Sequence, residues 1–435
     1  MNDWDFKFLE KYDDQICEIA EGYGLDWFPI NYEVCDYYEM IGHMSYHGMP
    51  SHYPHWSYGK SFERTHQMYS IGAEGLPYEL IINSNPSIAY LMRQNPAYLQ
   101  VLIMAHCVGH SDFFKNNREF KSTHPEIITS KFRNARKRIQ GYCENTNIGL
   151  EKVEFLLDVL HTIRFQTERN GRERVSREKI KERYIEKINS DKSGKMKDFD
   201  VNKNILEPDY DILGFLLEYG SHFESWEQDI INIVRDESHY FIPQIKTKIM
   251  NEGWASFWHY KIMNDLNLSQ DLHIPFLKTH NQVIRPHIGG INPYHVGFYI
   301  FQKLEREGGL DECFFAREIC NDVSGIMCHL DFEDMRELNL FSYSDKKKGV
   351  IIDDISDEPG WKEVKKDLIK STGMNSMPLV FISDISDDGC LILQHEHDGR
   401  DLELEYAERV VEKIGSIWPN DVKFFTIIED EAWEI

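Results

Sequence analysis

The chain has 435 residues, 41% of them hydrophobic, and a formal net charge of −25 at pH 7. This length predicts two domains, each with a hydrophobic core. The acidic charge argues against a general nucleic-acid or anionic-membrane binder, because phosphate groups would be repelled over most of the surface. The 8 cysteines include no Cys-x-x-Cys pair, so we expect reduced thiols in a cytoplasmic protein.

The beginning of the chain predicts no signal peptide, because it has neither a basic start nor an apolar stretch. No apolar run reaches about 18 residues, so no membrane-spanning helix is expected. Residues 6–23 predict an amphipathic helix, since apolar residues fall on one side of it, namely Leu9, Tyr12, Ile16, Ile19 and Ala20.

Residues 24–65 are rich in Tyr, Trp and His and are interrupted by prolines. A loop of this composition usually wraps a core or lines a cleft. We expect most of its rings to be structural, and we place His55 and Trp56 near a functional site. A short strand at 78–83 and a helix at 86–93 are predicted to follow.

The most informative stretch is residues 99–117, LQVLIMAHCVGHSDFFKNN. Its apolar run after a proline predicts a helix, on which His106 and His110 project from one face. Two imidazoles one turn apart are a common way to bind one metal ion. The alternative is two buried histidines hydrogen-bonded to neighbours. Residues 112–117 are expected to leave this helix in a polar turn, where Asp112 orients a histidine or acts as a cap or salt-bridge partner.

A second helix of interest is predicted at 151–163, where Glu154, Asp158 and His161 share a face. This pattern resembles the inward carboxylates and histidines of di-metal helix bundles, and a carboxylate–histidine hydrogen bond would produce the same pattern. The charged segment at about 165–205 is expected to be a solvated, flexible insertion.

The third candidate ligand is Glu252, which shares one helical face with His259 in an otherwise apolar segment. Burying an unpaired carboxylate there would be costly. A divalent ion held by His106, His110 and Glu252 would satisfy it and leave one position open for water. A structural ion pair with Arg or Lys is the alternative.

Residues around this centre are expected to line a substrate cleft. Asn251 and Trp254 flank the glutamate, His280 belongs to a proline-broken loop, and Trp56 and Tyr294 complete the set. Further helices are predicted at 130–140, 211–220, 224–236, 238–264, 293–306 and 311–323.

From about residue 333 the pattern changes to short apolar runs separated by turns. We therefore expect an α+β protein, with a large, mainly helical domain at 1–332 and a small α/β domain at 333–435. In the second domain His395 and His397 share a strand face, either as a metal or phosphate pocket or as part of a surface loop. Strands are predicted at 350–352, 379–382, 391–393 and 422–428, and helices at 359–370 and 402–415.

The chain resembles the stage V sporulation protein R (SpoVR-like) family over nearly its whole length. The resemblance rests on GLDWFP, YHGMPSHYPHWSYGKSFE, INSNPSIAYLMRQN, AHCVGHSDFFKNN, MNEGWASFWH, INPYHVGF and HEHDGRDL. It implies a role in formation of the spore cortex, a peptidoglycan layer, or in related stress physiology. It also implies a serine protein kinase as a partner, and it names a process more firmly than a reaction.

The two histidines and the later NEGWA segment also resemble the gluzincin metallopeptidases, which use HExxH and a downstream glutamate as third ligand. This resemblance implies a zincin-like core in which His106, His110 and Glu252 bind Zn²⁺. Cys107 stands where those peptidases have the glutamate that acts as general base. Ordinary peptidase chemistry would therefore need a base from outside the motif.

Three functions stay open at this point. The first is a zinc-dependent hydrolase with His259, Asp112 and His55 as catalytic residues, Glu63 and Glu79 being further candidates for the base. The second is a di-metal iron or manganese protein with redox chemistry. The third is a non-catalytic scaffold that docks a partner such as a kinase.

Overall fold

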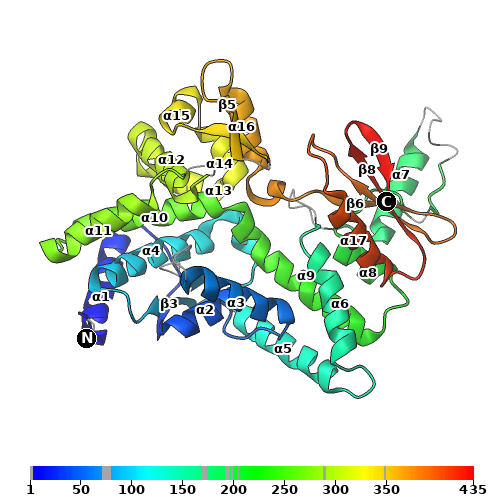
Figure 1. Ribbon diagram of the computed structural model, residues 1–435, viewed down its shortest axis with the longest axis horizontal. Helices are drawn as coiled ribbons and strands as arrows, with labels where there is room; N and C mark the ends of the chain where they lie inside the picture. The colour runs from blue at the N-terminus through cyan, green and yellow to red at the C-terminus, as the bar shows by residue number, and fades with distance from the viewer. Residues whose placement is uncertain are drawn as a thin grey trace. The chain divides into compact units, whose positions relative to one another are not determined.

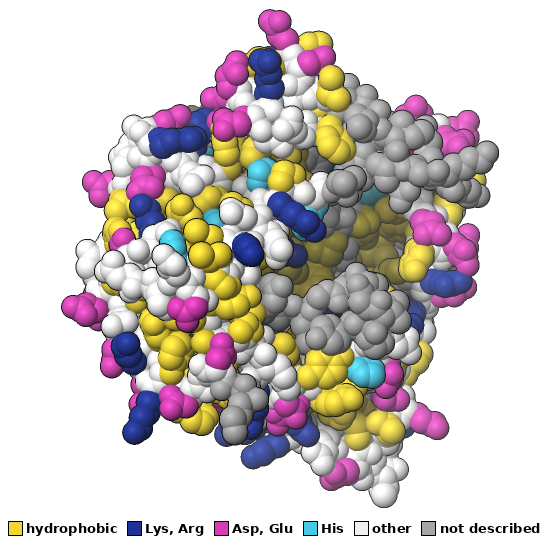
Figure 2. All heavy atoms as spheres, turned by 60° about the vertical axis from the view of Figure 1, so that its left-hand side comes forward, with side chains coloured by type: hydrophobic (Ala, Val, Ile, Leu, Met, Phe, Trp, Pro, Cys, Tyr) yellow, Lys and Arg dark blue, Asp and Glu magenta, His cyan; other side chains and the backbone are white. Residues whose placement is uncertain are grey.

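The computed structural model describes residues 3–70, 80–167, 174–191, 196, 199–203, 205–287, 291–346 and 349–435. It is mainly helical with small β-sheets, which confirms the predicted α+β class (Figure 1). Among the described residues, no helix is long and apolar enough to cross a membrane. On the face drawn in Figure 2, Asp and Glu side chains are spread among Lys and Arg, so the acidic charge marks no single patch there.

The chain divides into two compact units, each built from two separate segments. Unit 1 comprises Met1–Lys137 and Tyr240–Ser376, and unit 2 comprises Arg138–His239 and Met377–Ile435. The sequence instead predicted one boundary near residue 333. The two units are groups of residues in close contact, which is a different property from a boundary between independently folding domains. The domain boundary near residue 333 therefore stays a prediction.

Unit 1 contains a three-stranded sheet in the order β1-β3-β2. Strand β1 (Ile30–Cys35) pairs in parallel with β3 (Ser87–Met92), which pairs antiparallel with β2 (Leu80–Ile82). The helix predicted at 86–93 is therefore wrong. A short apolar run does not distinguish a helix from a buried strand, and pairing on both sides of β3 decides in favour of the strand.

The aromatic segment 24–65 is predicted as a loop, and this is also wrong in part. It holds β1, helix α2 (Tyr37–Ser45) and the beginning of α3 (Trp56–Ser70). A capping box starts α2, because the Asp36 side chain accepts from the Glu39 N–H while the Glu39 side chain accepts from the Asp36 N–H.

Helix α4 (Ala97–Asn116) lies at the centre of unit 1 and confirms the helix predicted to carry His106 and His110. The polar turn predicted at 112–117 is wrong, because the helix continues to Asn116. Nearly all of its residues are buried, so it must be enclosed by other elements. Helix α1 (Phe6–Tyr23), predicted with the same bounds, packs against it. Helix α10 (Lys248–Asp265) runs alongside it (Figure 1).

Helices α4, α10 and α12 (Pro293–Gly308) approach one another through small residues. A Cβ atom on Gly109 of α4 would lie 2.7 Å from the Cα of Ala255 in α10. A Cβ atom on Gly253 of α10 would lie 2.3 Å from the carbonyl carbon of Gly297 in α12. Any side chain there would collide with backbone, so glycine is what allows α10 to lie directly against both neighbours.

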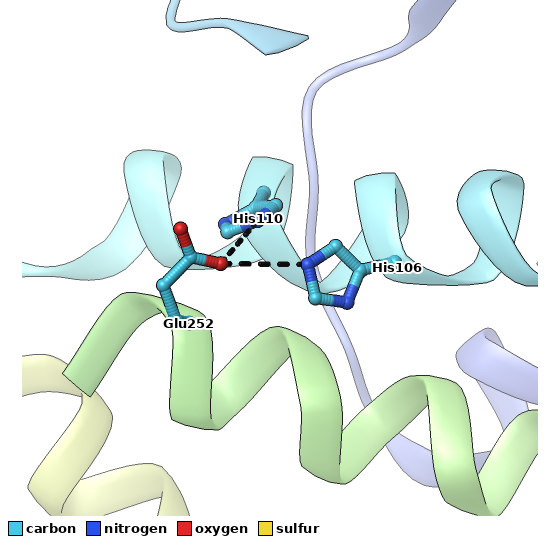
Figure 3. Close-up of side chains that lie close together, drawn as sticks. All are labelled: His106, His110 and Glu252. Atoms are coloured by element: carbon cyan, nitrogen blue, oxygen red, sulfur yellow. Dashed lines mark ion pairs between the residues drawn. The ribbon is translucent and has the colours of Figure 1, made fainter. Parts of the chain in front are cut away.

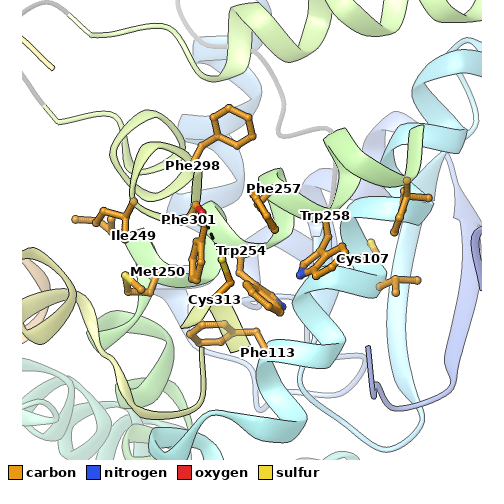
Figure 4. Packing of buried hydrophobic residues seen from close by; sticks show 14 of the residues in the cluster. Cys107, Phe113, Ile249, Met250, Trp254, Phe257, Trp258, Phe298, Phe301 and Cys313 are labelled. Carbon is orange, nitrogen blue, oxygen red and sulfur yellow. Dashed lines mark hydrogen bonds between the residues drawn. The ribbon is translucent and has the colours of Figure 1, made fainter. Parts of the chain in front are cut away.

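Large aromatic side chains fill the space around these crossings (Figure 4). The ring of Trp254 meets those of Trp258 and Phe301 in T-shaped contacts, with centroids 5.4 and 5.0 Å apart. Such edge-to-face pairs add to the stabilisation from apolar burial. Cys107 is fully buried in the same cluster (Figure 4).

The rest of unit 1 is helical, apart from one antiparallel pair of strands. Its elements are η1 (Arg118–Ser122), α11 (Gln270–Val283), α13 (Leu310–Ile319), α14 (Asp322–His329), α15 (Phe332–Glu337), β4 (Phe341–Lys346), β5 (Gly349–Ile355), α16 (Trp361–Lys370) and η2 (Gly373–Ser376). Two predictions need correction. His280 lies in α11 and not in a loop, and the helix predicted at 311–323 ends at Ile319 because Asn321 caps a new helix.

Unit 2 combines helices with a four-stranded sheet in the order β6-β7-β8-β9. Its elements are α6 (Leu150–Ile163), α7 (Arg177–Ser190), α8 (Ile212–Tyr219), β6 (Val380–Ile385), β7 (Leu391–His395), α17 (Leu404–Gly415), β8 (Val422–Ile428) and β9 (Glu431–Glu434). Two more helices, α5 (Ile128–Glu144) and α9 (Ser225–Lys246), contribute residues to both units. Helix α7 has no buried residue, as expected of the charged insertion, and 168–173 and 192–195 lie outside the described residues.

Candidate metal centre

Two helices bring together the three side chains that the sequence predicts as metal ligands. His106 and His110 lie one turn apart on α4, and Glu252 faces them from α10 (Figure 3). The Oε2 atom of Glu252 lies 3.6 Å from the Nε2 atom of His106 and 3.4 Å from that of His110. These three residues are the only such group of potential ligands among the described residues, with ligand atoms within 4.8 Å of one another.

The helix crossings explain why the glutamate reaches the histidines. Gly253 follows Glu252 directly, and Ala255 packs against Gly109, which precedes His110. Since these positions carry no bulky side chain, the backbones of α4 and α10 lie close together. The distance that remains between α10 and the two histidines of α4 is short enough for the Glu252 side chain to reach them.

The electrostatics of the centre favour a charged carboxylate at Glu252. Both histidines are buried, whereas the Glu252 side chain is 19% exposed, so the centre reaches the surface on the glutamate side. Burial raises the pKa of Glu252, but the adjacent His106 and His110 outweigh burial, and the net effect lowers that pKa. Oε2 itself is buried and makes no regular hydrogen bond to a described residue. A carboxylate held in this state is ready to ligate a cation.

The ring nitrogens that point away from Glu252 are engaged by other residues. The Nδ1 atom of His110 lies 2.8 Å from Oδ1 of Asn251. The Nδ1 atom of His106 lies 2.8 Å from Nδ1 of His259, whose Nε2 lies 2.8 Å from Nδ1 of His280. Hydrogen bonds of this kind orient imidazoles and select their tautomers.

These contacts involve three residues that the sequence analysis placed at the site: His259 as catalytic, and His280 and Asn251 as lining a cleft. His259 is predicted as catalytic, but both of its ring nitrogens are hydrogen-bonded inside the protein. Burial lowers the pKa of His259 and lowers that of His280 to about 4, so both rings are neutral. All three residues are buried: Asn251 contacts the ring of His110, His259 contacts that of His106, and His280 contacts His259. Their catalytic and cleft roles stay predictions.

Asp112 is also predicted as catalytic, and the structure places it in the core. Its buried carboxylate accepts from the backbone N–H of Asp26 and from the indole N–H of Trp254, both at 2.8 Å. The Nη1 atom of Arg317 lies 3.5 Å from Oδ2 of Asp112. Burial raises the pKa of Asp112 to about 6 in spite of this cation. Asp112 therefore anchors the core, and Trp254 is a core residue and not part of a cleft.

Two other predicted cleft residues lie in different surroundings. Tyr294 is half-buried, and its ring stacks with that of His106 at a centroid distance of 6.2 Å. Trp56 is 52% exposed at the start of α3. There His55 is buried, with its Nδ1 atom 2.7 Å from the hydroxyl of Ser57. The structure thus brings Tyr294 to the centre, while a catalytic role for His55 stays a prediction.

The remaining candidates give no second centre among the residues that the structure describes. Glu154, Asp158 and His161 lie on α6 of unit 2 and belong to no such group among the described residues. Glu63 is exposed on α3, and Glu79 lies outside the described residues.

The C-terminal histidines are held by local hydrogen bonds. His395 Nδ1 lies 3.0 Å from the hydroxyl of Thr426 on the neighbouring strand β8, and His397 Nε2 lies 3.0 Å from a carboxylate oxygen of Asp401. These bonds favour a structural turn over a metal or phosphate pocket.

One residue of the centre escaped the sequence reasoning. Asp322 is buried, and its Oδ1 atom accepts from the N–H of Met250 at 2.9 Å, which satisfies the first turn of α10 before Glu252. Burial raises the pKa of Asp322 to about 7, although backbone N–H groups in the first turn of α10 and the charge of Lys248 oppose the rise. No local signal marks this residue, because helix and cap are far apart in the sequence.

Comparison with known proteins gives one family and one curated relative. The model of the family described as "SpoVR like protein" matches residues 3–377. The uncharacterized protein YcgB of Escherichia coli (strain K12) is 33% identical over 484 aligned positions, which cover 100% of this chain and 94% of that protein. No solved structure matches the chain, and no match supports the looser resemblance to gluzincins.

Proposed function

The chain belongs to the SpoVR-like family, and we propose that its His106–His110–Glu252 group binds one divalent metal ion and hydrolyses an amide or ester. The observation that carries the proposal is the convergence of two imidazole nitrogens and one carboxylate oxygen from α4 and α10. Zinc is the favoured ion, because two nitrogens and one oxygen are a usual donor set for catalytic zinc.

The spacing of the donors supports a four-coordinate ion. Zinc bonds of about 2.0–2.1 Å at tetrahedral angles separate neighbouring ligand atoms by about 3.4 Å. The observed separations from Glu252 Oε2 are 3.4 and 3.6 Å. Direct hydrogen bonds would be shorter, at about 2.7–2.9 Å for charged partners.

A bound metal ion would polarise a carbonyl group and acidify a water molecule at the fourth position. The chain's own residues supply the setting. Asn251 and His259 hold the two imidazoles, Glu252 opens toward the surface, and Tyr294 stacks beside His106, where it borders an incoming substrate. Because Cys107 lies in the hydrophobic core, it does not replace the missing glutamate base.

The first experiment is elemental analysis and zinc titration of the purified protein. We expect about one zinc per chain, and an affinity lowered at least about 100-fold in Glu252→Gln and in His106→Ala, since each removes a ligand. Glu237→Gln, at a buried glutamate of unit 2, is the matched control and should bind zinc as the wild type does. Wild-type protein that binds no zinc, iron or manganese would refute the proposal.

The second experiment addresses the reaction. Zinc-loaded wild type and Glu252→Gln should be compared on amide and ester substrates, with peptidoglycan peptides first because the family name points to sporulation. Turnover by the wild type that is lost in the variant is expected. A folded, zinc-bound protein without turnover on any of them would contradict hydrolysis.

A second candidate function is a metal-stabilised scaffold that docks a partner such as a serine protein kinase. The replacement of the motif glutamate by a buried cysteine favours it. In that case the double variant His106→Ala/His110→Ala would lose thermal stability, yet any folded fraction would keep partner binding and the cellular phenotype.

A further inference from the structure

Three buried histidines form a continuous hydrogen-bonded line that starts at the candidate metal centre. His106, His259 and His280 come from α4, α10 and α11, and each is at most 2% exposed. Two contacts of 2.8 Å join them, from Nδ1 of His106 to Nδ1 of His259 and from Nε2 of His259 to Nδ1 of His280. We call these three residues the imidazole chain.

Each contact in the imidazole chain holds one proton. Two ring nitrogens 2.8 Å apart form a hydrogen bond only if one donates and the other accepts. A neutral imidazole carries one N–H group, so a ring that accepts at one nitrogen must donate at the other. The direction of the first hydrogen bond therefore sets the direction of the second.

The metal centre acts on the first ring of this chain. A metal ion needs the lone pair of the His106 Nε2 atom, which leaves the proton of that ring on Nδ1. Without a metal ion, the same Nε2 atom faces the Glu252 carboxylate at 3.6 Å, and a carboxylate favours an N–H group over a lone pair. The metal-bound and metal-free states therefore favour opposite tautomers of His106.

We propose that metal binding at His106 reverses the hydrogen-bond direction of the whole imidazole chain, so that the tautomer of His280 reports whether the centre is occupied. This inference rests on the proposed metal site. In the metal-free state His280 Nδ1–H donates to His259 Nε2, and His259 Nδ1–H donates to His106 Nδ1. In the metal-bound state His106 Nδ1–H donates to His259 Nδ1, and His259 Nε2–H donates to His280 Nδ1.

The proton count balances in this reversal. One proton leaves Nε2 of His106 to water as the metal binds, and one is taken up from water at Nε2 of His280. Between them, one proton crosses each of the two hydrogen bonds. Every ring carries one N–H group before and after, so no ring becomes an imidazolium and no net proton is released.

The other ligand histidine provides an internal reference. The amide oxygen of Asn251 only accepts, so the His110 Nδ1 atom donates to it with or without metal. The lone pair on His110 Nε2 is therefore always directed toward the centre. His110 should keep one tautomer throughout, while the imidazole chain changes.

The test is nitrogen-15 NMR of histidine-labelled protein, with and without one equivalent of zinc. Single His→Gln variants assign the rings. We expect His259 and His280 to change from Nδ1–H to Nε2–H tautomers on zinc binding, and His110 to stay Nδ1–H. Zinc binding with unchanged tautomers, or with an imidazolium in the imidazole chain, would overturn this inference alone. Wild type that binds no zinc would overturn the proposed function and this inference together.

A pair of variants tests the same idea through zinc affinity. His280→Asn keeps an acceptor near the place of Nδ1, whereas His280→Leu removes it at similar volume. We expect leucine to weaken zinc binding about 10-fold, at the lower end of the usual effect of an outer hydrogen bond, and asparagine to stay within about 3-fold of the wild type. Equal losses in two folded variants would indicate a packing role and contradict the imidazole chain.

Discussion

Helix α4 of unit 1 and helix α6 of unit 2 carry similar patterns, and only one of them becomes part of a potential ligand group among the described residues. His106 and His110 are spaced by one turn on α4, as Glu154 and Asp158 are on α6. What differs is the partner. Helix α10 lies against α4 through Gly109 and brings Glu252 to the histidines.

The difference between α4 and α6 shows that spacing along one helix is insufficient to bring three potential ligand atoms close together. Side chains three or four residues apart have Cβ atoms about 5–6 Å apart and need a facing element to supply the next ligand. That element must come close, which requires small residues at the crossing. In α10 these are Gly253 and Ala255, one and three residues after Glu252.

The largest effect should come from removing the close approach itself. Gly253→Ala places a Cβ atom 2.3 Å from the backbone of Gly297, so we expect a loss of about 3 kcal/mol of stability together with zinc binding. Gly141→Ala in α5 meets nothing within 4 Å and should be neutral or stabilising by about 0.5–1 kcal/mol. Urea unfolding measures both, and similar losses in the two variants would show that the helix crossing is not special.

The next effect compares the two helices directly. His110→Ala should lower zinc affinity by at least about 100-fold, since it removes a ligand. His161→Ala should leave both affinity and stoichiometry unchanged, because α6 belongs to no ligand group among the described residues. Zinc titration with elemental analysis decides this. Loss of one of two bound ions in His161→Ala would revive the di-metal function.

The smallest effect concerns pH and the start of α10. Asp322 has its pKa raised from 3.8 to about 7 by burial, so between these values the folded state binds more protons than the unfolded state. The contribution of Asp322 to the free energy of unfolding must therefore fall as pH rises from about 4 to about 7. Asp322→Asn cannot ionise, and its melting temperature should fall by a few degrees less than that of the wild type over this range.

The control for this prediction lies on the surface of unit 2. Asp401 is exposed and its pKa is lowered, chiefly by its hydrogen bond to His397, so it stays ionised throughout the same range. Asp401→Asn should keep the wild-type pH dependence between pH 4 and 7. A flattening as large as that of Asp322→Asn would mean that surface charge, and not the buried cap, sets the slope.

The sequence by itself determined the elements whose signals are local. Helix α1 follows from apolar residues at helical spacing, α4 from the proline before its apolar run, and strand β8 from a run of β-forming residues. The same spacing put His106 and His110 on one face, and the NEGWA segment singled out Glu252 as their partner.

Only the tertiary structure decided the conformation of β3 and the roles of the residues around the centre. Strand β3 owes its form to ladders with strands on both sides, and Asp112 is committed to Trp254 and Arg317. His259 and His280 join His106 in the imidazole chain because α10 contacts both α4 and α11. Local periodicity reports which face a side chain occupies, but hydrogen-bond partners come from distant segments, whose meeting depends on how closely the helix backbones pack.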